Sequence, residues 1–427
     1  MRGALALVLA SLLAVRGAAQ PGPPPAPRTP ADTAAAAGLR VYLLTFGPGD
    51  AIWERFGHNA IWVHDEASGT DLAYNWGIFD FRQPGFLRRF LVGDPLYSTE
   101  AFPAQPMAEF YAQSDRSTWM QELALPAEQR VALRDFVEWN ARPENKLYRY
   151  DYFRDNCSTR VRDALDRALG GALRRALADT TELTYRSESL RLMAGLIPAY
   201  AGMDVALGEP ADRPLTRWEA GFIPMRLRDA VRTVRVPDGR GGVRPLVASE
   251  RELYTARRPA EDATPPRRLP WFLLFGVGVA ALIVFLTRRA ERGGRGARRG
   301  VATLGAASGA LDGIFGVVLT LAWAATNHFA WYRNENLFQF SPIALFLAVA
   351  FPLALRARAS ERSMRAARRL TAALAALSVL GFLIQVLPGF DQSNGSIIAA
   401  AMPVHLALAW AAWRLTRSRF VDERVAP

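Results

Sequence analysis

The sequence predicts an α+β domain outside the cytoplasm, followed by an all-α transmembrane domain of five helices. Three observations lead to this architecture. The chain of 427 residues begins with a short apolar segment typical of secretion. Its middle part combines strand-like alternation with amphipathic helical periodicity. Its last third carries five apolar stretches, each near the ~20 residues that a helix needs to cross ~30 Å of hydrocarbon.

Residues 1–19 are predicted to be a secretory signal peptide. Arg2 precedes the apolar run Ala4–Val15, and small residues follow that run. The run is short for a membrane span, although an uncleaved anchor stays open as an alternative because Arg16 is unusual at this place. Residues 20–37 are rich in proline and alanine, which predicts a linker.

The remaining chain divides into a globular domain, a second linker and a membrane domain. The globular domain is expected over residues 38–237. A basic linker is expected over 238–270, with a hairpin around Pro237-Asp238-Gly239. The membrane domain is expected over 271–413, before a tail at 414–427. Its five predicted helices cover about 271–287, 303–325, 337–355, 370–388 and 396–413.

Arginines fix the predicted orientation of the membrane helices. Sixteen arginines lie in segments 288–300, 356–369 and 414–427, whereas the two other loops hold only Arg333. Arg-rich segments next to spans stay in the cytoplasm, so the tail is expected inside and the globular domain in the periplasm of a bacterial inner membrane. The net charge of +12 therefore reflects membrane topology, and no nucleic-acid partner is expected.

Cys157 is the only cysteine of the chain and stands in Asp155-Asn156-Cys157-Ser158-Thr159. Outside the cytoplasm cysteines usually pair, so a lone one is a buried small hydrophobe, an intermolecular partner or a working thiol. Residues 157–169 have the periodicity of an amphipathic helix, with Asp155 or Asn156 as the N-cap. Backbone N–H groups at a helix start lower the pKa of a thiol, and they can hold an oxyanion.

Four histidines are available as a base for such a thiol. His328 and His405 lie in or beside the membrane segments, whereas His58 and His64 lie on one predicted strand, residues 57–64. These two share a face but are about 20 Å apart along the strand, so one thiol cannot use both. His58 is the better candidate, because His64 borders a turn and is expected to be solvated.

A second predicted strand, from about Asp71 to Phe79, completes a hairpin with the strand of His58. Turns of four to six residues pair His58 with Asn75 or Gly77, and both registers place Asn75 on the face of His58. Asn75 is then able to orient the imidazole, as in Cys-His-Asn sites. A slip by one residue would turn Asn75 away, so a merely polar strand residue stays an open alternative.

These residues carry a family resemblance. A histidine on a hairpin about a hundred residues before a helix-start cysteine resembles the permuted branch of the papain-like NlpC/P60 superfamily, which includes lecithin:retinol acyltransferase-like enzymes. The chain resembles the Lnb-type lipoprotein N-acyltransferase family more closely. That resemblance rests on Phe56-Gly57-His58, on the segment from Tyr74 to Phe81, on Asp155–Thr159, and on His328 and Asn334-Glu335-Asn336-Leu337 ahead of Pro342. The retinol-type enzymes have a histidine on the second strand, where this chain offers Asn75.

The resemblance implies a permuted papain-like fold and acyl transfer. His58 would take the proton of Cys157, and the thiolate would attack an ester of a membrane phospholipid. The Ser158 or Cys157 N–H would stabilise the oxyanion. The N-terminal amine of a lipoprotein would then accept the acyl chain. The resemblance implies no cofactor and no metal, and the oligomeric state stays open.

Further polar and aromatic residues are candidates for substrate contact. Asn156 and Arg160 flank Cys157, and an external loop on the same side carries His328, Asn334 and Asn336; for that loop, simple solvation is the alternative. Two aromatic-rich stretches, with Arg88 and Arg89, are either a lipid-facing lip or core; they contribute Phe79, Phe81, Phe86, Phe90 and Leu91.

Two ionisable residues belong to the predicted spans. Asp312 lies within or at the edge of the second span; inside hydrocarbon it would indicate function, and at the boundary it would be ordinary. His405 is expected inside the last span, bonded to a neighbouring helix.

Two other functions compete with acyl transfer. A hydrolase of envelope peptides or lipids would use the same residues with water as the acceptor, although a peptidoglycan enzyme needs only a tether and not five spans. A non-enzymatic sensor or scaffold with a degenerate site is the second alternative. The survival of both His58 and Cys157 argues against degeneracy.

Overall fold

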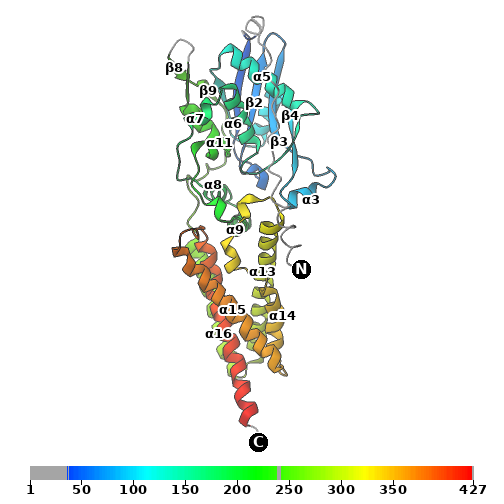
Figure 1. The fold of residues 1–427 in the computed structure, drawn as a ribbon, viewed down its shortest axis with the longest axis vertical. Coiled ribbons are helices and arrows are strands. Elements are labelled where there is room, and N and C mark those ends of the chain that lie inside the picture. The colour runs from blue at the N-terminus through cyan, green and yellow to red at the C-terminus, as the bar shows by residue number, and fades with distance from the viewer. Residues whose placement is uncertain (1–35, 37, 238–241, 426–427) are drawn as a thin grey trace, which may run out of the picture.

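The computed structural model describes residues 36, 38–237 and 242–425 (Figure 1). The predicted signal peptide lies outside the described residues, as does nearly all of the predicted linker 20–37. A mixed α/β domain is followed by a helical region, and the two are stacked along the long axis of the molecule (Figure 1). This arrangement matches the coarse architecture expected from the sequence.

An antiparallel sheet organises the first domain. Seven strands of the described chain pair in the order β6-β4-β3-β2-β1-β5-β9. Their bounds are β1 Leu39–Phe46, β2 His58–Asp65, β3 Thr70–Ile78, β4 Leu96–Pro103, β5 Thr118–Leu123, β6 Leu147–Arg149 and β9 Val247–Tyr254. The central strands bury side chains on both faces: Leu43 and Ile61 lie on one face, and Leu44 and Ala60 on the other. Helices therefore have to cover both faces of the sheet.

One face packs against three helices and the other against one. The first face contacts α5 (Ala127–Ala141), α6 (Cys157–Ala168) and α11 (Pro224–Thr233), while α4 (Ala104–Gln113) covers the second. Shorter helices complete the domain: α3 Phe86–Leu91, α7 Ala172–Ala176, α8 Tyr185–Leu192, α9 Ile197–Ala206 and α10 Arg217–Ala220, with 3₁₀ turns η1 Ile52–Glu54 and η2 Glu209–Ala211.

The hairpin of β2 and β3 has one of the two predicted registers. Ala60 lies opposite Asn75, which places Asn75 one diagonal step from His58 on the same face of the sheet. The ladder between β3 and β4 is irregular between Trp76 and Ile78, so the sheet is locally interrupted at Gly77.

The predicted linker 238–270 is wrong over part of its length. The expected hairpin is present as β7 (Arg235–Pro237) and β8 (Val243–Pro245), although its turn at 238–241 lies outside the described residues. The strand after it, β9, pairs with β5 at the edge of the main sheet, so the sheet domain runs to Tyr254. Most of β9 is exposed, and its side chains therefore lack the apolar alternation that marks a half-buried strand.

Four helices in the described chain are long and apolar enough to cross a membrane. The first two are α12 (Leu269–Glu291) and α13 (Arg295–Ala325). The third, Glu361–Val386, consists of α15 (Glu361–Leu383) and the 3₁₀ turn η5 (Ile384–Val386). The fourth, Gly395–Arg417, is the first part of α16 (Gly395–Val425). Together with the apolar composition, these helices make the protein a multi-pass membrane protein.

The fifth predicted span, 337–355, is not confirmed as a full span. Residues 335–338 form the 3₁₀ turn η4, and only α14, Ala344–Ala354, is α-helical. Eleven residues cover about 16 Å, roughly half of the hydrocarbon thickness. This short helix packs closely on α13: a Cβ atom on Gly309 would lie 2.7 Å from the Ala348 nitrogen. The non-helical backbone before α14 is thus buried in protein, where membrane proteins tolerate it.

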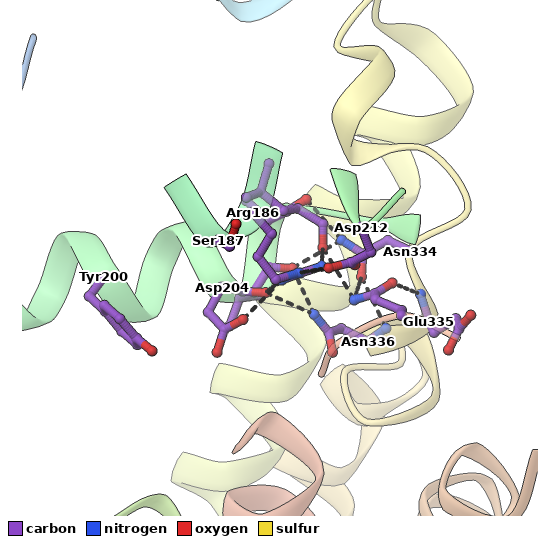
Figure 2. Close-up of polar contacts among 12 residues, drawn as sticks. Arg186, Ser187, Tyr200, Asp204, Asp212, Asn334, Glu335 and Asn336 are labelled. Carbon is purple, nitrogen blue, oxygen red and sulfur yellow. Dashed lines mark hydrogen bonds and ion pairs between the residues drawn. The ribbon is translucent and has the colours of Figure 1, made fainter. Parts of the chain in front are cut away.

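A buried polar network joins the sheet domain to the membrane helices (Figure 2). Arg186 of α8 pairs with Asp204 at 2.9 Å and with Asp212 at 2.8 Å. Asn334, which precedes η4, donates to the carbonyl oxygens of Val205 and Ala206 at the end of α9. The Asn336 amide donates in the same direction to Val205 O at 3.0 Å, and Gln392 donates to Leu207 O at 3.2 Å. In the opposite direction, the Gly208 N–H donates to Ala330 O at 2.7 Å. The two parts therefore meet through fixed, desolvated contacts.

We expect Arg186→Leu to destabilise the protein by roughly 3–5 kcal/mol, because it leaves the buried Asp204 and Asp212 carboxylates without their cation. Thermal unfolding of the detergent-solubilised protein measures this change. Arg213→Leu is the matched control, since its ion pair with Glu219 is more exposed, and removal of such a pair costs about 0–1 kcal/mol. If the unfolding temperature falls by the same small amount in both variants, Arg186 does not stabilise the junction.

Candidate active site

The helix that carries Cys157 begins at that residue, as the sequence predicts. Asn156 is the N-cap: its Oδ1 accepts from the backbone N–H groups of Ser158 and Thr159 at 2.9 Å each. Its Nδ2 donates to the Tyr152 and Phe222 carbonyl oxygens. The Asn156 side chain is buried and fully bonded within its own chain. These bonds fix the start of α6, and substrate contact by Asn156 stays a prediction.

The Cys157 thiol is a half-buried group with a raised pKa. Backbone N–H groups of Asn59, Ser158 and Cys157 itself face the sulfur and favour the thiolate, as does the charge of Arg116. Burial opposes them more strongly and raises the pKa of Cys157 to about 11. The sequence predicted a lowered pKa from the helix start alone, and that prediction is wrong because desolvation outweighs the N–H groups.

His58 and Asn75 form a directed hydrogen bond. The His58 Nε2 lies 2.9 Å from the Asn75 Oδ1. The Asn75 amide is oriented by its own Nδ2, which donates to Ala73 O at 2.8 Å and to the Met107 sulfur at 3.3 Å. Its oxygen therefore faces His58, which places the imidazole proton on Nε2 and leaves Nδ1 with a lone pair. Burial lowers the pKa of His58 to about 4, so the ring is neutral at physiological pH.

Shared neighbours bring His58 and Cys157 into one site. The sulfur faces the N–H of Asn59, the residue after His58. Tyr111 of α4 stacks on the His58 ring with centroids 6.1 Å apart, and burial raises its pKa to about 12 with a contribution from Cys157. Arg116 lies over Tyr111 at 4.5 Å and acts on the pKa of both His58 and Cys157. His58 and Cys157 thus share these neighbours, and both groups are neutral at physiological pH.

The comparison with known families identifies this part of the chain. The family model of the Lnb N-terminal periplasmic domain matches residues 27–188, a range that includes His58, Asn75 and Cys157. The chain has an Lnb N-terminal periplasmic domain. The match confirms the resemblance to the Lnb-type family, and it places this Lnb domain in the periplasm. A search of curated proteins and a search of solved structures found no match.

Two other residues of the Lnb domain differ from their predicted roles. Ser158 is fully buried, and its hydroxyl lies 2.8 Å from Asn59 Oδ1 and 2.6 Å from Gly221 O. Its N–H faces the sulfur but also donates to Asn156, so the predicted oxyanion donor is already shared. Arg160 pairs with Asp155 through two nitrogens and lies 4.0 Å over the Tyr148 ring. The guanidinium is thus held inside the chain, and the prediction that Arg160 binds substrate is not supported.

The predicted substrate residues outside the Lnb domain separate into two groups. Asn334 and Asn336 are buried in the polar junction and bond the end of α9, and their contact with substrate stays a prediction. His328 is half-buried and stacks on Tyr152, five residues before Cys157, at 6.3 Å. It therefore borders the Lnb domain on the side of the thiol.

Asp312 and His405 meet inside the membrane helices. Asp312 is buried within α13, and its Oδ2 lies 3.1 Å from the His405 Nε2 of α16. Asp312 therefore does not occupy the exposed boundary position that the sequence left open. The expected hydrogen bond of His405 to a neighbouring helix is confirmed.

Asn59, Tyr111 and Arg116 also belong to the site and were not predicted from the sequence. Asn59 is buried, and its amide donates to Leu44 O and to the Thr45 hydroxyl, which fixes the strand beside His58. Its place next to the candidate base was a usable signal. Tyr111 and Arg116 come from α4 and the turn after it, and no spacing in the sequence relates them to His58 or Cys157.

Gly77 leaves room for the thiol, which leads to a test by substitution. Its φ is +88°, and an added Cβ would lie 3.4 Å from the Cys157 Cβ and 3.6 Å from the Tyr150 ring. We expect Gly77→Ala to cost about 1–2 kcal/mol of backbone strain and also to place a methyl group in van der Waals contact with Cys157. Gly69→Ala is the control, because φ is +69° and nothing lies within 4 Å. Unfolding midpoints report the strain, and only Gly77→Ala should change the rate of Cys157 alkylation.

The raised thiol pKa predicts how Cys157 alkylation depends on pH. Thiolate is the reactive form, so the rate with iodoacetamide should rise about tenfold per pH unit and level off only near pH 11. An imidazolium–thiolate pair would instead give a plateau across neutral pH. Mass spectrometry of the single modified cysteine gives the rate, with Cys157→Ser as the blank. An alkylation rate that is constant across neutral pH would show that Cys157 and His58 are not both uncharged.

Proposed function

We propose that the protein is a cysteine acyltransferase of the bacterial inner membrane. It moves a fatty acyl chain from a membrane phospholipid, through a thioester on Cys157, to the N-terminal amine of a lipoprotein. The observation that carries this proposal is that the lone thiol and the His58–Asn75 pair share the neighbours Tyr111 and Arg116, in an Lnb domain joined to membrane helices. We further propose that this domain is a permuted papain-like fold and that the C-terminal tail is cytoplasmic, as the arginine distribution indicates.

The first half-reaction forms the thioester. His58 Nδ1 takes the thiol proton as the Cys157 sulfur attacks the ester carbonyl carbon of the lipid. The Cys157 and Asn59 N–H groups, which face the sulfur, are the proposed donors to the oxyanion, with Ser158 N–H already shared. The bond from carbon to the ester oxygen then breaks, and His58 gives its proton to the departing lysolipid alcohol.

The second half-reaction transfers the chain. The lipoprotein amine attacks the thioester carbonyl, and His58 takes a proton from the attacking nitrogen. The carbon–sulfur bond breaks, an amide forms, and His58 returns its proton to the sulfur. Asn75 keeps the ring oriented with Nδ1 free throughout, since its oxygen accepts only from Nε2. Because both groups start neutral, proton transfer and attack on the ester have to be coupled.

Labelled phospholipid tests this proposal. Purified full-length protein is given a phospholipid with an isotopically labelled acyl chain, and mass spectrometry follows Cys157. A labelled thioester should form, and a lipopeptide with a free N-terminal amine should then carry the label as an amide. The same lipopeptide with an acetylated amine is the control, for which the thioester should accumulate. Free fatty acid without an acylated amine would assign the protein as a hydrolase. If neither a Cys157 adduct nor a product forms, the transferase and the hydrolase assignments are both overturned, and a sensor or scaffold is favoured.

A further inference from the structure

Exposed apolar side chains gather beside the thiol at the membrane-facing end of the sheet domain. We define the aromatic lip as Trp53, Phe81, Leu87, Phe90 and Leu91, which the structure leaves exposed to solvent. Leu87 is 67% exposed and Leu91 is 61% exposed, and both belong to α3. Soluble surfaces rarely carry so many neighbouring large apolar groups, so the patch indicates a docking surface.

The lip is one continuous aromatic surface. Phe81 contacts Trp53, with ring centroids 6.4 Å apart, and contacts the buried Phe86 at 5.3 Å. Phe86 in turn stacks on Phe90 at 6.1 Å. The exposed rings are therefore supported from beneath, and they form a preformed surface.

The aromatic cluster beneath the lip extends towards the thiol. Phe79 contacts both Phe81, at 5.0 Å, and Tyr97, at 5.2 Å, and Tyr97 stacks on Tyr150 at 4.1 Å. The Tyr150 ring and the Cys157 Cβ both border Gly77. Ring contacts inside the domain thus link the exposed lip to the neighbourhood of the reactive sulfur.

The position of the lip is fixed relative to the membrane helices. The Asn327 N–H, just beyond the end of α13, donates to the carbonyl oxygen of Val92 at 2.8 Å, directly after α3. Phe90 contacts Tyr152 at 6.2 Å, and Tyr152 stacks on His328. Helix α3 therefore lies at the end of the sheet domain that meets the helices, whereas β8 lies at the opposite end (Figure 1).

We propose that the aromatic lip inserts into the periplasmic leaflet of the membrane that the helices span, and that it is the entry surface for the acyl donor. This inference rests on the proposed function for the identity of the lipid, but insertion itself does not require catalysis. Aromatic and leucine side chains next to exposed arginine are typical of interfacial segments. Arg88 is exposed on α3 beside Leu87 and fits the phosphate of a phospholipid headgroup.

The single cysteine makes a clean depth measurement possible. In a Cys157→Ser background, Leu87→Cys or Leu91→Cys introduces the only thiol of the chain, which is labelled with an environment-sensitive fluorophore. The full-length protein is reconstituted into phosphatidylethanolamine/phosphatidylglycerol vesicles that contain lipids brominated on the acyl chain. Val243→Cys on β8 is the matched control, because this apolar residue is 59% exposed at the far end of the domain.

We expect brominated lipid to quench the labels at positions 87 and 91 at least threefold more than the label at 243, and iodide in the water to show the reverse order. Equal quenching by brominated lipid at all three positions would overturn the inference. Protection of position 87 from both quenchers would also overturn it, because the occupant would then be a protein. The labelled chains lack Cys157, so they report insertion independently of catalysis. If the lip inserts but the wild-type chain forms no acyl thioester, the proposed function is refuted and the membrane insertion of the lip still holds.

Discussion

Cys157→Ser is expected to lower the rate of lipoprotein N-acylation roughly 10⁴- to 10⁶-fold, the usual cost of losing a catalytic nucleophile. The serine hydroxyl is close in size, so the Asn156 cap and the packing of α6 should be kept. An alcohol is a much weaker acid and nucleophile than a thiol, so His58 cannot activate the substituted serine to the same extent. Acylated lipoprotein in cells, or acylated peptide in vesicles, measures the loss.

The interpretation of this result depends on protein that is still folded and inserted. Membrane abundance and the unfolding midpoint of Cys157→Ser should match the wild type. Acylation at the normal rate by a Cys157→Ser chain would exclude a thioester mechanism outright. Because no other cysteine exists, no second thiol can replace the lost one.

His58→Ala is expected to lower the acylation rate about 10²- to 10⁴-fold, the range for loss of a general base. A thiol whose pKa is about 11 holds very little thiolate at neutral pH, so it depends on the imidazole to remove its proton during attack. Added free imidazole should restore part of the rate if it reaches the vacated space. Asn75→Ala should give a smaller loss, because the base stays but is no longer oriented.

His64→Ala is the matched control for His58→Ala. His64 lies on the same strand and face, but its Nδ1 bonds Asp71 at 3.1 Å and its side chain is half-exposed. Exposed substitutions of this kind usually change stability by less than about 0.5 kcal/mol, so activity should stay near the wild-type rate. Equal losses in the two variants would show that His58 acts through the strand and not through its ring.

The fold was predictable where the sequence pattern follows burial. The hairpin of β2 and β3 and the start of α6 were predicted because alternation and capping residues act locally. Strand β9 was missed because an edge strand needs no apolar face. The short α14 was missed because composition reports hydropathy, whereas the non-helical residues before it depend on tertiary contacts with α9 and α13.

The candidate site was predictable in part for a related reason. Chemically distinctive residues such as Cys157 and His58 were singled out by rarity and compartment. The structure gives Asn156, Arg160, Asn334 and Asn336 bonds within the chain that were not predicted, because polarity alone cannot separate a side chain that binds a ligand from one that satisfies buried groups. The pKa of Cys157 likewise depends on desolvation by distant segments, which the helix start does not encode.

In the proposed reaction, the buried junction between the sheet domain and the helices also decides whether the thiol or the lipid ester has to move. A flexible hinge would let the thiol descend to an ester at the edge of the hydrocarbon. Fixed contacts from Arg186, Asn334 and Asn336 hold the thiol at one height, so the donor has to rise instead. Each methylene drawn out of hydrocarbon into water costs about 0.8 kcal/mol. The enzyme's preference for acyl chains of a given length would then depend on how many methylenes the aromatic lip shields from water as the donor leaves the bilayer. A closed pocket that fits one chain length would not be required.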